Sequence, residues 1–257
     1  MGEQTEEGTH GNVFRGKRGE LLQRDELFFE TARRIFLEEG IHELTISKLA
    51  DLTGFSRATL YDRFGSKEGL LVELGIECQL ELRAMLQRAA GYPGGSREQI
   101  QAVSIAMHDY SARYSDSMRI VATIGDESIA SRVSEAKQAR MREIDTDMFR
   151  ILLRIVHRAL DEGDLKLPAG FRPEALCLVI WAMADGCAAA MRGSAPLEEF
   201  GIQDPLGELM MGGPWFLDGW GWRPLSSDWD YEGSMVRIRA FLDGEAPSES
   251  KATPVVE

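Results

Sequence analysis

The run from Thr45 to Glu68 constrains the fold of this chain more than any other part of the sequence. Ala50 supplies a small side chain where two short helices can cross closely, and Gly54, four positions later, tolerates a positive φ in the turn between them. Leu60, six positions after the glycine, is an apolar residue of the second helix that can pack on the first. This spacing predicts a helix-turn-helix.

The residues around these two helices support the same prediction. Thr45 and Ser56 each stand where they can cap the start of a short helix, over residues 45–53 and 56–64. An apolar stripe over residues 20–39, ended by Gly40, predicts a longer helix in front of them. The sequence therefore predicts a three-helix domain over residues 20–66.

The remainder of the chain also has helical patterning, and no alternating strand pattern of useful length occurs. We expect an all-α fold in which a larger helical domain, residues 67–243, follows the first. A polar arm over residues 1–19 and a disordered tail over residues 244–257 complete the predicted organisation. Helices are expected near residues 66–90, from 96 onward, and over 132–162, 173–192 and 230–242, with irregular chain over 193–230.

The run LADLTGFSRATLYDRFGSKEGLL resembles the DNA-binding signature of the TetR family of repressors. The similar positions are Thr45, Ala50, Gly54, Ser56, Thr59, Leu60, Tyr61, Phe64, Lys67 and Glu68. The chain departs from the family pattern at Ala58, often glycine, and at Gly65, often proline or another turn residue. The resemblance covers residues 20–75, and beyond it only the order of helices and two short turns match.

The resemblance implies that the second short helix lies in the major groove of double-stranded operator DNA. Arg57, Ala58 and Thr59 are then the candidates for reading bases, because a guanidinium can donate two hydrogen bonds to guanine and a methyl group can contact thymine. Thr45, Ser56, Tyr61 and Lys67 are expected to contact phosphates and hold the register. Arg15, Lys17 and Arg18 resemble the basic arm that some family members lay into the minor groove. For each of these residues an ordinary surface or packing role is the alternative.

The distribution of charge is compatible with this role although the net charge is −13. Residues 15–67 carry ten Lys and Arg against nine Asp and Glu, whereas residues 68–257 carry nineteen against thirty. The acidity thus lies outside the segment assigned to DNA, and attraction to phosphates acts over short distances at physiological salt.

Residues 175–191 are apolar on nearly every side, which a surface helix of a monomer cannot be. We expect one side to face the domain core and the other a second copy of the chain, with the final helix adding a second apolar stripe. A homodimer also doubles the number of base pairs that are read. The residues expected at the interface are Ala182, Gly186, Ala189, Ala190, Ile238 and Phe241.

A helical domain of this size has room for a small-molecule effector, which we expect to be apolar or aromatic. Plain core packing is the alternative reading of the candidate lining residues. A Gly- and Trp-rich run, residues 212–222, either covers this pocket or packs on the domain. The candidate contacts are Met107, His108, Tyr110, Tyr114, Met118, Met148 and Trp181, with His157 as a second possible polar anchor.

Other function classes find less support in the sequence. No catalytic order of Ser, His and Asp and no phosphate-binding glycine loop occurs, and the four histidines show no metal-ligand spacing, so we expect neither an enzyme nor a cofactor. The three cysteines are far apart, as in reduced cytoplasmic proteins. No signal peptide or full membrane span is predicted. Two alternatives remain: an enzyme, and a helical module that binds protein and not DNA. Salt-dependent retention on DNA would distinguish a DNA-binding regulator from the protein-binding module.

Overall fold

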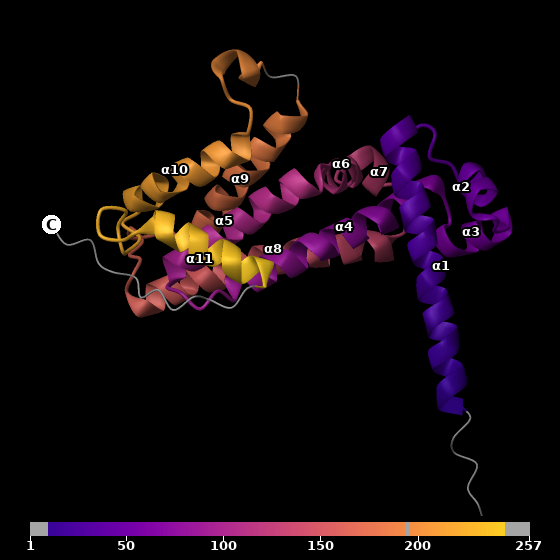
Figure 1. Ribbon diagram of the computed structural model, residues 1–257, viewed down its shortest axis with the longest axis horizontal. Coiled ribbons are helices and arrows are strands. Elements are labelled where there is room, and N and C mark those ends of the chain that lie inside the picture. Colours follow the sequence, from indigo (N-terminus) through magenta and orange to yellow (C-terminus); the bar gives the residue numbers. More distant parts are fainter. Residues whose placement is uncertain (1–9, 194–195, 245–257) are drawn as a thin grey trace, which may run out of the picture. The chain divides into compact units, whose positions relative to one another are not determined.

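The computed structural model describes residues 10–193 and 196–244, and every regular element in those ranges is a helix (Figure 1). This confirms the all-α prediction. The helices are α1 His10–Glu39, α2 Ile46–Thr53, α3 Arg57–Phe64, α4 Lys67–Ala90, α5 Ser96–Arg113, α6 Ser115–Ile124, α7 Glu127–Ala130, α8 Glu135–Glu162, α9 Pro173–Arg192, the 3-10 helix η1 Leu197–Phe200, α10 Pro205–Gly219 and α11 Tyr231–Asp243.

The chain divides into two compact units, which we call the head and the body. The head contains residues 10–75 together with 123–137, and the body contains the other described residues. Phe28 of α1 is fully buried in the head and meets the rings of Phe55 and Phe64 edge-on, with centroids 5.0 and 5.9 Å apart. Leu49 and Leu60 are also fully buried, so the three helices share one small core.

Helix α1 begins earlier than the sequence predicts. Residues 10–19, expected in a flexible arm, form the first turns of this helix, whereas residues 1–9 of the expected arm lie outside the described ranges. The expectation of a flexible arm rested on the polar, glycine-rich composition of the first residues of the chain. A single glycine costs a helix only about 1 kcal/mol relative to alanine, and no proline interrupts the run.

In the body, α10 packs against both α9 and α5, and α11 packs against α5. Helix α8 supplies much of the apolar core, as its stripe of apolar residues predicts. The buried residues of this stripe are Met141, Ile144, Met148, Ile151, Leu152, Ile155, Val156 and Ala159.

The expectation of irregular chain over residues 193–230 is wrong for α10. Asp204 caps this helix by accepting a hydrogen bond from the Gly207 amide at 2.9 Å, and Pro205 occupies its first turn, where a proline is tolerated. Burial of Leu206 and Leu217 then outweighs the weak helix propensity of the Gly-rich run, although Pro214 lies inside the helix. The Trp-rich run 212–222 therefore belongs largely to a helix.

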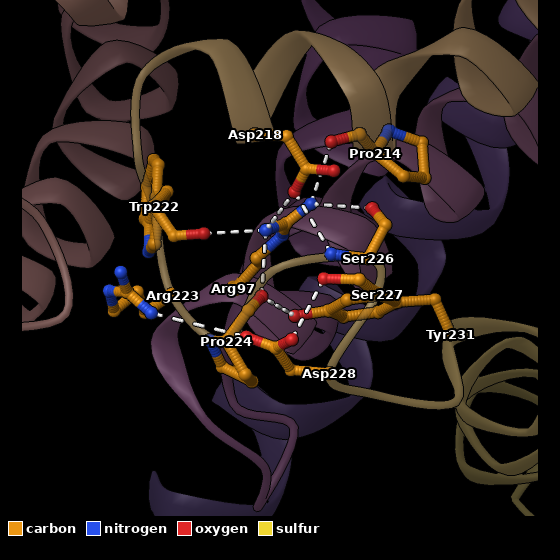
Figure 2. A network of polar contacts seen from close by, with 10 residues as sticks. All are labelled: Arg97, Pro214, Asp218, Trp222, Arg223, Pro224, Ser226, Ser227, Asp228 and Tyr231. Atoms are coloured by element: carbon orange, nitrogen blue, oxygen red, sulfur yellow. Dashed lines mark hydrogen bonds and ion pairs between the residues drawn. The ribbon is translucent and has the colours of Figure 1, made fainter. Parts of the chain in front are cut away.

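The segment between α10 and α11 is organised by the buried side chain of Arg97, from α5 (Figure 2). The guanidinium lies 4.7 Å from the ring centroid of Tyr231, and the indole of Trp222 beside it is fully buried. The segment thus has a fixed path without regular secondary structure. The guanidinium donates to the carbonyl oxygens of Pro214, Trp222 and Pro224, to the Ser226 hydroxyl and to the Asp218 carboxylate.

Candidate functional site

The two short helices of the head start and stop where the sequence predicts. The Thr45 hydroxyl accepts a hydrogen bond from the Lys48 amide at 3.1 Å, and the Ser56 hydroxyl accepts one from the Thr59 amide at 3.1 Å. Gly54 has φ +76° and its amide caps α2. A positive φ at this position strongly favours glycine, so the turn between the helices depends on it.

Helix α3 presents two different faces. Leu60 and Phe64 point into the head core. Arg57, Ala58 and Tyr61, at helical spacing, lie on the exposed side, and the Tyr61 side chain is half exposed. The structure therefore places these three predicted contacts together on one solvent-facing surface.

The Arg57 guanidinium and the Lys67 ammonium differ in how firmly they are held. Arg57 is 62% exposed and its nearest carboxylate, Asp51, is 3.9 Å away and also exposed, so the guanidinium can reorient toward a ligand. Lys67 starts α4 and donates to the carbonyl oxygen of His42 at 3.2 Å. An ammonium group has three donors, so Lys67 can hold this turn and still reach a phosphate.

Arg63 of α3 has a role that no local sequence pattern indicates. Its guanidinium pairs with Asp25 of α1 at 3.0 Å and lies 3.8 Å from the Glu73 carboxylate of α4. It also lies over the Phe64 ring, 5.0 Å from the centroid. Arg63 therefore connects α3 to α1 and to α4 through ion pairs. This role becomes evident only when the folded structure places Asp25 and Glu73 next to its guanidinium.

The candidate effector contacts lie in different surroundings within the body. Tyr110 and Met148 are buried in the body core, where the Tyr110 hydroxyl donates to the Cys78 carbonyl oxygen at 2.9 Å. Tyr114 is 45% exposed and its ring stacks near that of Tyr110. The remaining candidates, Met107, His108, Met118 and Trp181, are partly exposed along three different helices.

A pocket that the structure shows in the body lies among α5, α10 and the start of α11. Its volume of about 30 Å³ is far below the ~300 Å³ or more of typical ligand sites. None of the candidate effector contacts lines it. The lining residues are Arg97, Ile100, Gln101, Ser104, Met210, Gly213, Pro214, Leu217 and Tyr231.

His108 lies between two carboxylates of the body. Its Nε2 is 2.7 Å from Asp204 and its Nδ1 is 3.2 Å from Asp109. Burial lowers the pKa of His108, but the hydrogen bonds to Asp204 and Asp109 outweigh it, so the net pKa is raised above the ordinary value of 6.5. Only an imidazolium can donate to both acids at once.

We expect this arrangement to make folding stability depend on pH above neutrality. A raised pKa in the folded state means that the contribution is fully present below pH 6.5 and is lost as the pH rises through the folded-state pKa. Thermal unfolding followed at pH 6 and pH 8.5 should show a larger loss of stability for the wild type than for His108→Gln. Equal losses in the two proteins would contradict this assignment.

The three cysteines of the body are not paired with one another. The three cysteines are free, and burial, with the Glu174 carboxylate nearby, raises the pKa of the Cys177 thiol to about 12. Such a thiol is unreactive at neutral pH. Within residues 10–193 and 196–244, no group of three His, Cys, Asp or Glu side chains could hold a metal ion.

Helix α9 is unusually apolar for its exposure. Residues 173–191 are long and apolar enough to cross a membrane by length and composition alone, yet only 17% of the stretch is buried within the chain. Ala182, Gly186 and Ala189 lie on its exposed side, with Leu178 59% exposed, whereas Ala190 is half-buried. Helix α9 therefore leaves apolar side chains exposed on one side.

The two interface candidates in α11 have roles within their own chain. Ile238 is fully buried and has no surface to offer a partner. The Phe241 ring packs edge-on against Tyr92, 5.5 Å away. Since α11 packs on α5 and α10 packs on α9, the helix that extends the α9 surface is α10. Its exposed apolar side chains are Met211 and Trp215.

The sequence model described as "Bacterial regulatory proteins, tetR family" matches residues 28–74, which contain the C-terminal part of α1, all of α2 and α3, and the start of α4. No curated protein sequence matches the chain significantly.

Several solved structures resemble a large part of the chain. A TetR-family regulatory protein from Rhodococcus RHA1 is 15% identical with a TM-score of 0.55, covering 88% of this chain and 98% of that one. The transcriptional regulator FadR from Bacillus subtilis, solved with stearoyl-CoA, is 18% identical with a TM-score of 0.55, covering 73% and 98%. The ketosteroid transcriptional regulator KstR2 of Mycobacterium tuberculosis is 18% identical with a TM-score of 0.51, covering 74% and 94%. At these identities the likeness shows the fold.

Proposed function

We propose that this chain, which belongs to the TetR family of transcriptional regulators, is a repressor that leaves a palindromic operator when a small molecule binds its body. The observation that carries the DNA-binding part is the exposed face of α3. A short helix whose start is capped by Ser56 and whose inner face is locked into the head core presents Arg57, Ala58 and Tyr61 outward.

The chemistry of that face suits the major groove. Arg57, exposed and loosely paired, can donate to guanine O6 and N7, and the Ala58 and Thr59 methyl groups can contact a thymine methyl. Tyr61 and Lys67 can donate to phosphates, while Thr45 and Ser56 place the amide groups of the helix starts near the DNA backbone. We assign base recognition to residues 57–59. We assign phosphate contacts, which hold the helix in position along the DNA, to Thr45, Ser56, Tyr61 and Lys67.

A homodimer would allow two heads to read the two halves of a palindrome. We assign its interface to the exposed sides of α9 and α10, where apolar and small residues lie in adjacent helices. Ala182, Gly186 and Ala189 allow close approach of the partner helix, and Met211 and Trp215 extend the apolar surface. Ala190 contributes at the edge. We propose that the protein acts in the cytoplasm, where it has access to operator DNA.

We propose that the effector binds in the body and is an apolar small molecule. Two structural neighbours support this, because one was solved with stearoyl-CoA and another is named as a ketosteroid regulator. Tyr110, Tyr114, Met118 and Met148 remain the proposed contacts, with His108 and Trp181 at the periphery. Since Tyr110 and Met148 are packed in the core, the ligand would have to open this region, and it would act by its different affinity for the two arrangements.

Selection of bound sequences from a random duplex library, followed by fluorescence anisotropy at several salt concentrations, tests the proposed function. We expect a near-palindromic site and an affinity that falls steeply as salt rises, because phosphate contacts release counterions. Failure to enrich any sequence, together with weak binding that salt does not change, would refute DNA binding.

Single substitutions should separate base reading from phosphate contact. Arg57→Ala should relax the preference at one position of each half-site by about 1–3 kcal/mol. Lys67→Ala and Tyr61→Phe should weaken binding to every sequence alike, and Lys67→Ala should reduce the slope of log Kd against log salt by about one phosphate contact. Anisotropy titrations with the selected duplex and with single-base variants measure both effects. An unchanged operator affinity for Lys67→Ala would contradict its assignment.

A further inference from the structure

Residues 123–137 belong to the head, although about fifty residues separate them from its other part. Contacts of Ile124, Arg132 and Lys137 help to attach them. Ile124 lies so close to Gly75 of α4 that a Cβ there would be 2.3 Å from the Ile124 Cδ1 atom. Arg132 lies 3.4 Å from the Glu68 carboxylate on the surface. The third contact, made by Lys137, reaches the end of α3.

The Lys137 ammonium group has three partners, all in the head. It lies 3.2 Å from the carbonyl oxygen of Phe64, 3.2 Å from that of Gly69 and 3.3 Å from the Glu73 carboxylate. Phe64 is the last residue of α3, and the last carbonyl groups of a helix lack partners within it and carry partial negative charge. Lys137 therefore supplies both a donor and a positive charge to the C-terminal end of α3.

Gly69 makes room for this contact. A Cβ at position 69 would lie 2.0 Å from the Phe64 carbonyl oxygen and 3.2 Å from the Lys137 Nζ atom. A contact at 2.0 Å with a backbone oxygen forces the backbone to shift. The approach of the end of α3 to the start of α4 thus depends on glycine at position 69, and Lys137 bridges the two carbonyl groups that this approach brings together.

Lys137 also lies at the start of α8, whose later residues belong to the body. We propose that Lys137 is a positioning residue for DNA binding: it holds the C-terminal end of α3 and makes the orientation of the DNA-reading helix depend on α8. This rests on the proposed function. Met148, one of the core residues of the body, lies on the same continuous helix α8 as Lys137.

The test uses the full chain with Lys137→Met, which removes the charge and the donors but keeps an unbranched side chain. We expect affinity for the selected operator to fall about tenfold, equivalent to about 1.4 kcal/mol. The slope of log Kd against log salt should stay unchanged, because Lys137 positions α3 and does not touch phosphate. Hydrogen exchange should speed up for the amides of the last turn of α3. Lys137→Arg, which keeps charge and donors, should restore most of the affinity.

Arg132→Met is the matched control, because it removes one positive charge from the same segment at an exposed pair. It should change the affinity less than twofold. Gly69→Ala tests the same contact in a second way. It keeps Lys137, but the added Cβ displaces the Phe64 carbonyl group that Lys137 contacts. It should reproduce the faster exchange and the weaker binding.

Wild-type affinity and exchange in α3 for both Lys137→Met and Gly69→Ala would overturn the proposal while leaving DNA binding intact. A reduced salt slope for Lys137→Met would also overturn it, because Lys137 would then contact phosphate directly. If the wild type bound no DNA, the proposed function would fail, and the exchange measurement would still decide whether Lys137 holds the end of α3.

Discussion

Gly186→Glu is expected to convert the proposed dimer into a monomer and to lower operator affinity at least about a hundredfold. A charged side chain at this position would be trapped against the apolar surface of the partner helix, and the loss of the second head removes the avidity of a two-site complex, typically about 10²–10⁴. The fold of the monomer should not suffer, because a Cβ at Gly186 meets no atom within 4 Å. Sedimentation velocity measures the assembly, and circular dichroism confirms that the helices persist.

Two further variants locate the interface. Trp215→Glu, in α10, should also weaken the dimer, because the side chain is 72% exposed beside α9. Val236→Glu, in α11, alters an equally exposed apolar residue on a helix that packs against α5, and it should leave the dimer intact. If Gly186→Glu sedimented as a dimer, or if only Val236→Glu dissociated it, the interface would lie elsewhere.

Arg97→Met is expected to lower the free energy of unfolding by about 3–5 kcal/mol, the range for removal of one partner from a buried ion pair. The change leaves the carbonyl oxygens of Trp222 and Pro214 without their donor and the Asp218 carboxylate without its counter-charge (Figure 2). A hydrophobic side chain of similar length cannot satisfy these groups. Urea unfolding followed by tryptophan fluorescence measures the loss, since Trp222 lies in the same cluster.

The matched control is Arg223→Met, one residue after Trp222. Its guanidinium is 64% exposed and 3.9 Å from Asp228, so we expect a change within about 0.5 kcal/mol. Arg97→Lys should give an intermediate loss, because an ammonium group keeps the charge but has fewer donors. A loss below about 1 kcal/mol for Arg97→Met would show that the cluster does not hold the segment between α10 and α11.

The sequence was most informative where one short stretch decides the structure. Thr45, Gly54 and Ser56 act through hydrogen bonds and backbone angles within four residues, so their roles could be predicted and the structure confirms their geometry. The apolar stripe of α8 was predictable for the same reason, because its period depends on a single helix. In both cases the resulting surface or core follows from neighbouring residues alone.

The body could be predicted less well, since its details depend on contacts between distant residues. Local propensity argued against α10, but burial of Leu206 and Leu217 stabilises it. Apolar spacing suggested Ile238 for a dimer interface, yet the same pattern serves a helix buried in its own subunit. Aromatic and methionine residues at helical spacing on α5 and α8 likewise indicate that one face of each helix is buried. The spacing does not indicate whether a ligand or other side chains pack against that face.

The sequence by itself determined the helix-turn-helix and its caps, because each depends on residues within the one short stretch from Thr45 to Phe64. Only the tertiary structure decided which charges matter. Arg97, Arg63 and Lys137 are ordinary cations in the sequence, yet each pairs with a residue far along the chain: Arg63 with Asp25, 38 positions away, Lys137 with Phe64, 73 away, and Arg97 with Ser226, 129 away. Ion pairs between residues so far apart in the sequence produce no repeating sequence pattern. These roles could therefore be identified only from the folded structure.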